Sequence, residues 1–179
     1  MALPVEDYAQ LGGMDTAALV GRDGSIDWPC LPRFDSPACF AALLGNRDNG
    51  HWLLSPKEQA TTTRSYFGDS FVLETTHETA TGMVRVTDYM PLGEDRADIV
   101  RQVEGFGGTV RMRHEWVVRS DFGKIRPWVM RRADSPEIGA GAVISASRGQ
   151  TWSCCAGRVC RMPSAPVTRM SLTSLQVSG

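Results

Sequence analysis

An acid next to an aromatic ring is a combination found in sugar-hydrolysing sites, and four of the aspartates with an aromatic neighbour are considered as candidates on this ground. The pairs are Asp27 with Trp28, Asp35 with Phe34, Asp88 with Tyr89, and Asp121 with Phe122. Adjacent residues of a strand point to opposite faces of a sheet, so the two members of a pair would not line one pocket. We therefore expect no catalytic residue among these pairs.

Structural roles account for the aspartates that the pattern allows us to place. Asp23 has the position of a turn residue and Asp35 that of a helix cap. Asp27 is placed to fix the conformation of its own loop. Asp88 falls on the same face as Val84 and Val86 at a strand end, so we expect a satisfied edge residue rather than an acid catalyst.

His114 alternates with Val110, Met112 and Trp116 on one face of the segment from Thr109 to Arg119. The histidine has two interpretations: a general base in an apolar cleft, or a neutral core histidine that donates to a backbone carbonyl. No serine or cysteine nucleophile is assigned nearby, which favours the structural interpretation.

Charged residues occupy the opposite face of the same segment. They are Arg111, Arg113, Arg119 and Glu115. Such a row is either a docking surface for a neighbouring domain or a solvated strand face. Alternating charge is common on the solvent-exposed face of a sheet, so a solvated face is favoured.

The sequence predicts no metal site and no cofactor. The three histidines are scattered, and the five cysteines contain no CxxC spacing. We expect buried thiols. The glycine-rich run from Gly105 to Gly108 lacks the lysine and helix that follow in a phosphate-binding loop, so it is interpreted as a turn.

The chain has 179 residues, 42% hydrophobic and 22% charged, with a net charge of -1. These values are typical of one ordinary globular domain, and they argue against a nucleic-acid groove or an anionic membrane surface as the main partner. The length is too short for a large barrel enzyme. No apolar run approaches a membrane helix and no signal peptide begins the chain, so a cytoplasmic location is expected.

Short segments of period-2 hydrophobicity, separated by turn residues, predict an all-β fold, an antiparallel β-sandwich. We expect three hairpins: 17–20 with 25–28 across a type I′ turn at Asp23-Gly24, 71–78 with 83–89, and 99–104 with 109–119. In the second hairpin Phe71, Leu73 and Thr75 share a face. A proline in the first turn and a terminal glycine delimit a single short helix over 35–45.

The composition changes after about residue 132. Residues 133–179 contain two acids, four bases, eight serines and three of the five cysteines, and the hydrophobic alternation is lost. Apart from one short strand over 141–146, this part is expected to be an irregular tail.

Several motifs together resemble the N-terminal domain of bacterial glycoside hydrolase family 15 proteins, the trehalase and glucoamylase-like group. The most specific stretch runs from Arg22 to Phe40. Weaker motifs are 4–9, 16–20, 63–66 with 72–75, 84–91, 103–105, 121–123 and 127–128. The resemblance covers about residues 3–131, which predicts a domain at 1–131 and a separate tail at 132–179.

The resemblance implies an N-terminal part of a larger supersandwich that is followed in intact family members by an (α/α)6 barrel. Two glutamates of that barrel act as general acid and base in an inverting hydrolysis. The present sequence holds no barrel, so these glutamates have no counterpart, and the chain alone is expected to be inactive. Substrate would be reached only through the barrel, whether trehalose, a malto-oligosaccharide or another glucoside.

The resemblance also singles out the aromatic and proline-rich stretch from Asp27 to Phe40. In an intact relative this loop is expected to face the barrel. Trp28, Arg33, Phe34 and Asp35 are the candidates for edging a sugar pocket or forming the domain interface, because arginine and aspartate bind hydroxyls and tryptophan stacks on sugar rings.

Three functional interpretations stay open at this point. The chain is the non-catalytic domain of a trehalose- or α-glucan-hydrolysing enzyme, a free-standing module that binds carbohydrate or a partner, or a product truncated or frameshifted near residue 132. A truncated sandwich would expose unpaired strand edges, so self-association is expected.

Overall fold

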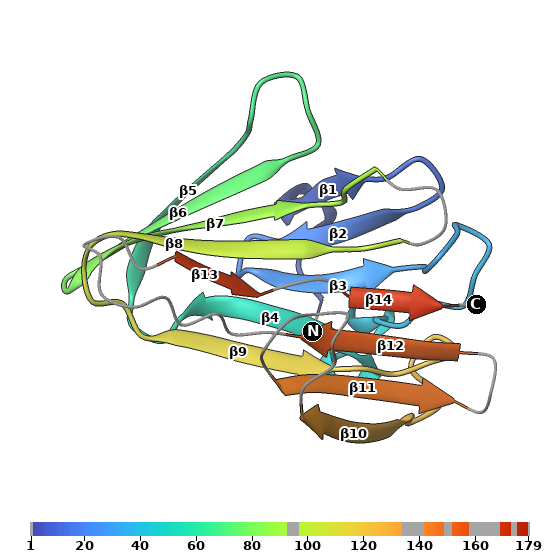
Figure 1. Ribbon diagram of the computed structural model, residues 1–179. Coiled ribbons are helices and arrows are strands. Elements are labelled where there is room, and N and C mark those ends of the chain that lie inside the picture. The colour runs from blue at the N-terminus through green and yellow to red at the C-terminus, as the bar shows by residue number, and fades with distance from the viewer. Residues whose placement is uncertain are drawn as a thin grey trace.

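The computed structural model describes residues 2–92 and 97–133, together with strand segments 142–148, 152–157, 169–172 and 175–178. The described elements are antiparallel strands and three 3-10 turns, in agreement with the predicted all-β fold. The turns are η1 (Val5–Asp7), η2 (Ala42–Leu44) and η3 (Arg47–Asn49). Figure 1 shows that the strand axes of the two larger sheets are roughly aligned, and that the loop between β5 and β6 projects away from both sheets.

Within the described residues, fourteen strands form three sheets. In spatial order, the first sheet contains β1 (Tyr8–Gly12), β2 (Ala17–Gly21), β3 (Ser25–Pro29), β4 (His51–Pro56) and β9 (Met112–Val117). The second contains β13 (Arg169–Leu172), β8 (Val100–Gly108), β7 (Gly82–Tyr89), β6 (Leu73–Thr79) and β5 (Ala60–Tyr66). The third contains β10 (Trp128–Ala133), β11 (Ala142–Arg148), β12 (Trp152–Gly157) and β14 (Leu175–Ser178).

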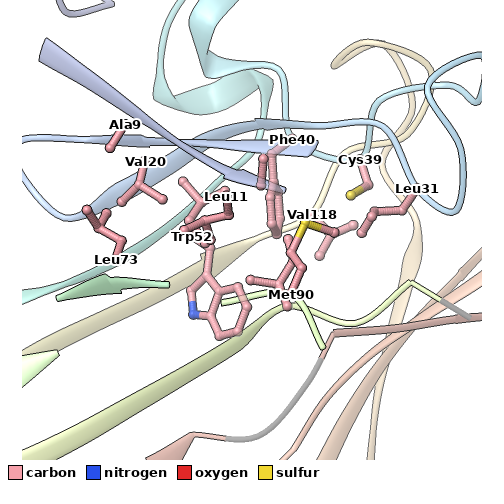
Figure 2. Close-up of a cluster of buried hydrophobic side chains, with 13 residues drawn as sticks. Ala9, Leu11, Val20, Leu31, Cys39, Phe40, Trp52, Leu73, Met90 and Val118 are labelled. Atoms are coloured by element: carbon pink, nitrogen blue, oxygen red, sulfur yellow. The ribbon is translucent and has the colours of Figure 1, made fainter. Parts of the chain in front are cut away.

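The first and second sheets pack face to face around a shared core. Alternate residues of β6 and β7 are buried, as expected when one face of a strand meets the core and the other meets water. Leu73 of β6 joins Leu11, Ile26 and Trp52 of the first sheet in the larger cluster of buried side chains. Figure 2 shows this cluster, with Ala9, Val20 and Leu73 toward one end and Leu31 and Cys39 toward the other.

A buried ion pair within the second sheet also contacts the backbone of the first sheet's side of the sandwich. Arg101 of β8 is fully buried and donates to both carboxylate oxygens of Asp88 on β7, at 2.9 and 3.1 Å. The same guanidinium donates to the carbonyl oxygens of Trp52 on β4 and of Gly24 in the turn between β2 and β3, at 2.7 and 2.8 Å. Asp88 is therefore a buried partner of an arginine inside the sandwich, and the prediction of an edge residue was wrong.

Two of the three predicted hairpins are confirmed. β2 pairs with β3 across Asp23-Gly24, and β6 pairs with β7. The first turn differs in type, because only Gly24 has a positive φ, +82°, whereas a type I′ turn needs positive φ at two residues. Phe71 lies before β6 and is 57% exposed, so it does not share the buried face of Leu73.

The third predicted hairpin was wrong. β8 pairs with β7 and β13, whereas β9 pairs with β4, so the chain crosses from one sheet to the other between them. The glycine run forms the end of β8 instead of a turn. Its glycines allow β7 and β8 to approach, since a Cβ on Gly108 would lie 2.0 Å from the Thr81 carbonyl oxygen.

Two further predictions need correction. In place of a short helix over 35–45, the structure has bends and the single 3-10 turn η2. The predicted strand at 141–146 is present as β11, but β12, β13 and β14 also lie in the part expected to be irregular. Strand pairing there was missed because it depends on partners such as β8, which pairs with β13 and is far away in sequence. The domain boundary at 131 and the non-native origin of the tail stay predictions.

Candidate functional site

The candidate residues lie on one loop that leaves β3, with Trp28 at its base. Trp28 is half-buried against Cys30, Ala38 and Ala41. Its ring lies 6.0 Å from that of Phe122, centroid to centroid. One side of the tryptophan is therefore fixed by packing, which leaves only part of the ring for an outside partner.

Buried residues hold both ends of this loop. Leu31 is 1% exposed, and Cys39 and Phe40 are fully buried in the core cluster (Figure 2). Cys30 and Ala38 form an isolated β-bridge between the two ends. Because the ends are anchored in the core, the residues between them are presented from a fixed base.

Arg33, Phe34 and Asp35 lie at the exposed tip of the loop. The Arg33 Nε atom is 3.1 Å from Asp35 Oδ1, and these side chains are 67% and 76% exposed. Phe34 is 64% exposed, and its backbone N–H donates to the Asp15 carbonyl at 2.9 Å. The predicted role of Asp35 as a helix cap was wrong because no helix begins there, and its carboxylate instead accepts a hydrogen bond from Arg33.

A second loop, 120–125, packs against the first one. Asp121 and Phe122 have φ values of 54° and 55°, a left-handed conformation that is uncommon for residues other than glycine. The Phe122 N–H donates to the Ala38 carbonyl at 3.4 Å, and Ser120 pairs with Ile125 across the loop. Two adjacent strained residues cost about 1–3 kcal/mol each, and such strain often occurs at functional sites. The sequence showed Phe122 as the aromatic neighbour of Asp121 and as part of a motif, but gave no sign of its contact with Trp28.

Asp27 has the structural role that was predicted for it. It is 6% exposed and accepts hydrogen bonds from Tyr8 Oη at 2.7 Å and Ser25 Oγ at 2.5 Å. Burial, followed by the Asp27 hydrogen bond, raises the pKa of Tyr8, so its hydroxyl stays a donor. The ladder between β2 and β3 shifts at this residue, with Val20 opposite Ile26 and Leu19 opposite Trp28.

His114 is not a core histidine that donates to a backbone carbonyl. Its side chain is exposed, and its Nε2 accepts a hydrogen bond from Trp52 Nε1 at 2.8 Å. Loss of water around the ring, together with the positive charge of Arg101, lowers the pKa of His114. The ring is therefore neutral near pH 7, as expected, but through a contact that the sequence pattern did not indicate.

The charged face of β9 carries a network centred on Glu115. Arg113 Nη2 lies 2.6 Å from one Glu115 oxygen, and His51 Nε2 lies 3.2 Å from the other. Arg47 connects Glu115, at 3.7 Å, to Asp23, at 2.8 Å. These contacts, led by the Arg113 hydrogen bond, lower the pKa of Glu115. Beside them lies an open groove of about 740 Å³ lined by residues 55–57 and 112–115.

The two cysteines whose side chains are described lie in clusters of buried residues. Cys30 and Cys39 are buried free thiols, as predicted, and burial raises the pKa of both. The side chains of Cys154, Cys155 and Cys160 lie outside the described residues.

In the described part of the chain, no group of three or more His, Cys, Asp or Glu side chains is arranged to hold a metal ion. Within that part, no helix is long and apolar enough to cross a membrane.

Comparison with known families identifies the domain. The family model described as "Trehalase-like, N-terminal" matches residues 1–174. The chain belongs to the trehalase-like N-terminal domain family. The match extends past residue 131, where the recognisable sequence motifs end.

Curated relatives of this trehalase-like N-terminal domain are named trehalase. The protein from Mycobacterium tuberculosis is 39% identical over 92 residues, which are 51% of this chain and 13% of that protein. Trehalase from Thermoplasma acidophilum is 31% identical over 124 residues, 63% of this chain and 21% of that protein. Trehalase 1 from Sulfolobus acidocaldarius is also 31% identical over 124 residues, 69% of this chain and 21% of that protein.

The chain spans about a fifth or less of the length of these relatives. No solved structure matches it significantly. The family is therefore shown by sequence similarity, and the fold is shown by the sheets described above.

Proposed function

We propose that this chain is the non-catalytic N-terminal domain of an enzyme that hydrolyses trehalose or an α-glucan with inversion, and that it packs on the catalytic (α/α)6 barrel. The observation that carries the proposal is the family match over residues 1–174, with relatives named trehalase of which the chain covers only a small part.

The loop around Arg33 is the proposed contact with that barrel or with the sugar it holds. Support comes from its anchored base and exposed tip, together with the strained loop that packs beneath it. An exposed arginine–aspartate pair contributes about 0–1 kcal/mol to stability, so selection for folding alone gives little reason to place it there.

Two assays test this function. The purified chain, incubated with trehalose and with malto-oligosaccharides, should release no glucose, since the proposed catalytic glutamates lie in the barrel. In a full-length relative, the Ala substitution equivalent to Arg33→Ala should lower kcat/KM at least about tenfold without changing the unfolding midpoint. Hydrolysis by the chain alone, or unchanged kinetics in the variant, would contradict the respective part of the proposal.

A free-standing sugar-binding module is the second candidate, because Phe34 and the Arg33–Asp35 pair are exposed side by side in sequence at one loop tip. Isothermal titration calorimetry with trehalose and maltotriose separates the two functions. The domain of an enzyme predicts no heat of binding without the barrel. A module predicts binding that Arg33→Ala weakens, with Arg22→Ala, at an exposed ion pair outside both loops, as the control.

A further inference from the structure

The two edges of the first sheet differ in how their backbone groups are covered. At one edge, the Tyr66 hydroxyl bonds both the N–H and the carbonyl of Gln10 on β1, each at 2.9 Å. Arg64, also on β5, donates to the carbonyls of Val20 and Asp7. At the other edge lies β9, and among the described strands only β4 pairs with it.

The phase of the β4–β9 ladder shows which backbone groups of β9 point away from β4. The Lys57 N–H donates to the Arg111 carbonyl at 2.8 Å. Hydrogen-bonded and non-hydrogen-bonded pairs alternate along an antiparallel ladder, so Arg113 and Glu115 also direct their backbone groups to β4. The N–H and carbonyl groups of the intervening residues, Met112, His114 and Trp116, face the open edge.

The side chains of this edge are complementary to a second copy of themselves. In an antiparallel pair centred on His114, Arg113 lies opposite Glu115 of the second copy, and Met112 lies opposite Trp116. Both relations occur twice because of the twofold symmetry. The Arg–Glu pairs fall at the non-hydrogen-bonded positions, where opposing side chains are closest, and opposite charges there are favourable.

The same register also continues the core. Met112 and Trp116 are half-buried and pack against the two clusters of buried side chains inside the sandwich. Their pairing across the edge would extend that apolar layer, while the charged network at Arg113 and Glu115 stays on the outer face.

We propose that two copies of this chain associate by antiparallel pairing of their β9 edges about a twofold axis at His114. A second copy is favoured over a different strand by the charge match, since an unrelated strand would need the same alternation of acid and base. The dimer does not depend on the proposed enzymatic role, because β9 carries none of the loop residues assigned to it.

Sedimentation velocity with charge-reversal variants tests this dimer. The unaltered chain should show a monomer–dimer equilibrium. Arg113→Glu and Glu115→Arg each place like charges opposite each other twice, and each should raise the dimer Kd at least about tenfold. An equimolar mixture of the two variants restores both opposite-charge pairs, so it should form a heterodimer. Lys124→Glu, the same charge change at an exposed loop residue, should leave Kd unchanged.

Hydrogen exchange gives a second measurement that does not depend on the folding of any variant. As protein concentration rises, the amides of Met112, His114 and Trp116 should become protected, whereas those of Arg113 and Glu115 should be protected at every concentration. A chain that stays monomeric would overturn the proposal. So would a dimer that Arg113→Glu weakens no more than Lys124→Glu does, or exchange at His114 that does not change with concentration.

Discussion

Arg101 and the groups around it show how much depends on single residues in this sandwich. The guanidinium makes hydrogen bonds to Asp88 and to the backbone carbonyls of Trp52 on β4 and Gly24 in the β2–β3 turn, all at 3.1 Å or less. It also lies over the Trp52 ring, 5.4 Å from the centroid. A buried charge is tolerated only when its partners are present, so these contacts fix the sheets relative to each other.

Replacing Arg101 with leucine should therefore destabilise the fold strongly. The change leaves the Asp88 carboxylate buried without its counter-charge, and the expected loss is about 3–5 kcal/mol of unfolding free energy. Urea denaturation followed by circular dichroism measures the loss. Arg22→Leu, which removes the exposed ion pair with Asp7, is the control and should cost at most about 1 kcal/mol. Equal effects of both changes would contradict this account.

Two histidines predict how the stability depends on pH. Burial lowers the pKa of His77; the negative charge of Asp88 raises it and the positive charge of Arg101 lowers it, both by less than burial does. The pKa of His114 is also lowered. The unfolded state then binds more protons below about pH 6.5. The unfolding free energy should be at its full value above that pH and should fall as the pH drops below 6.5. The fall is at most about 1.4 kcal/mol per pH unit for the buried His77 and smaller for the exposed His114, whose charge water screens.

Urea titrations between pH 7.5 and 5.5 measure this slope. His77→Asn should reduce it, because the variant has no titrating ring at the buried position. The lowered pKa of Glu115 acts in a separate window, since a carboxylate stabilised in the native state loses its effect only below about pH 4.5. A variant with the full slope between pH 7.5 and 5.5 would show that His77 is not responsible.

At the scale of elements, β7 and β8 approach closely at the end of β8, just before the chain crosses to the other sheet. Gly108 has a φ of +67°, and Gly82, its partner in the ladder, has backbone atoms of 107–109 within 3.1 Å of the place where a Cβ would lie. Side chains at these two positions would collide with the backbone of the neighbouring strand. The glycines are thus needed for strand pairing, although the sequence pattern suggested a turn.

A matched pair of glycine substitutions tests this requirement. Gly108→Ala combines a left-handed φ with a contact to the Thr81 carbonyl, so it should lower the unfolding free energy by more than about 1 kcal/mol. Gly107→Ala meets nothing within 4 Å and should change it by less than that. Thermal and urea unfolding of the two variants decide between a steric requirement and a general effect of losing a glycine.

At the scale of the whole molecule, the second sheet uses a strand from near the end of the chain. β13 pairs with β8, with Met170 opposite Val103. The family match to residue 174 covers this strand. A strand that protects the β8 edge gives this part of the chain a structural role within the sandwich.

A truncation tests that role. A chain that ends at Ala133 loses β13 and leaves the edge of β8 unpaired, so its urea midpoint should fall and its tendency to aggregate should rise. Light scattering and urea unfolding, compared with the chain of 179 residues, measure both effects. A truncated chain with unchanged stability and solubility would instead support a tail of non-native origin.

The sequence by itself determined the local features. Alternation in β6 and β7 and the Asp-Gly turn predicted two hairpins, and the motif from Arg22 to Phe40 indicated the family. Period-2 burial and turn chemistry are set by neighbouring residues, which one sequence displays directly.

Only the tertiary structure decided the pairings between distant segments. It placed β9 beside β4, Asp88 against Arg101 and Phe122 against Trp28. Each of these contacts joins residues whose local patterns allowed several partners. Strand order and buried ion pairs depend on how whole sheets cover one another, and this information is spread over the chain instead of residing in any one segment.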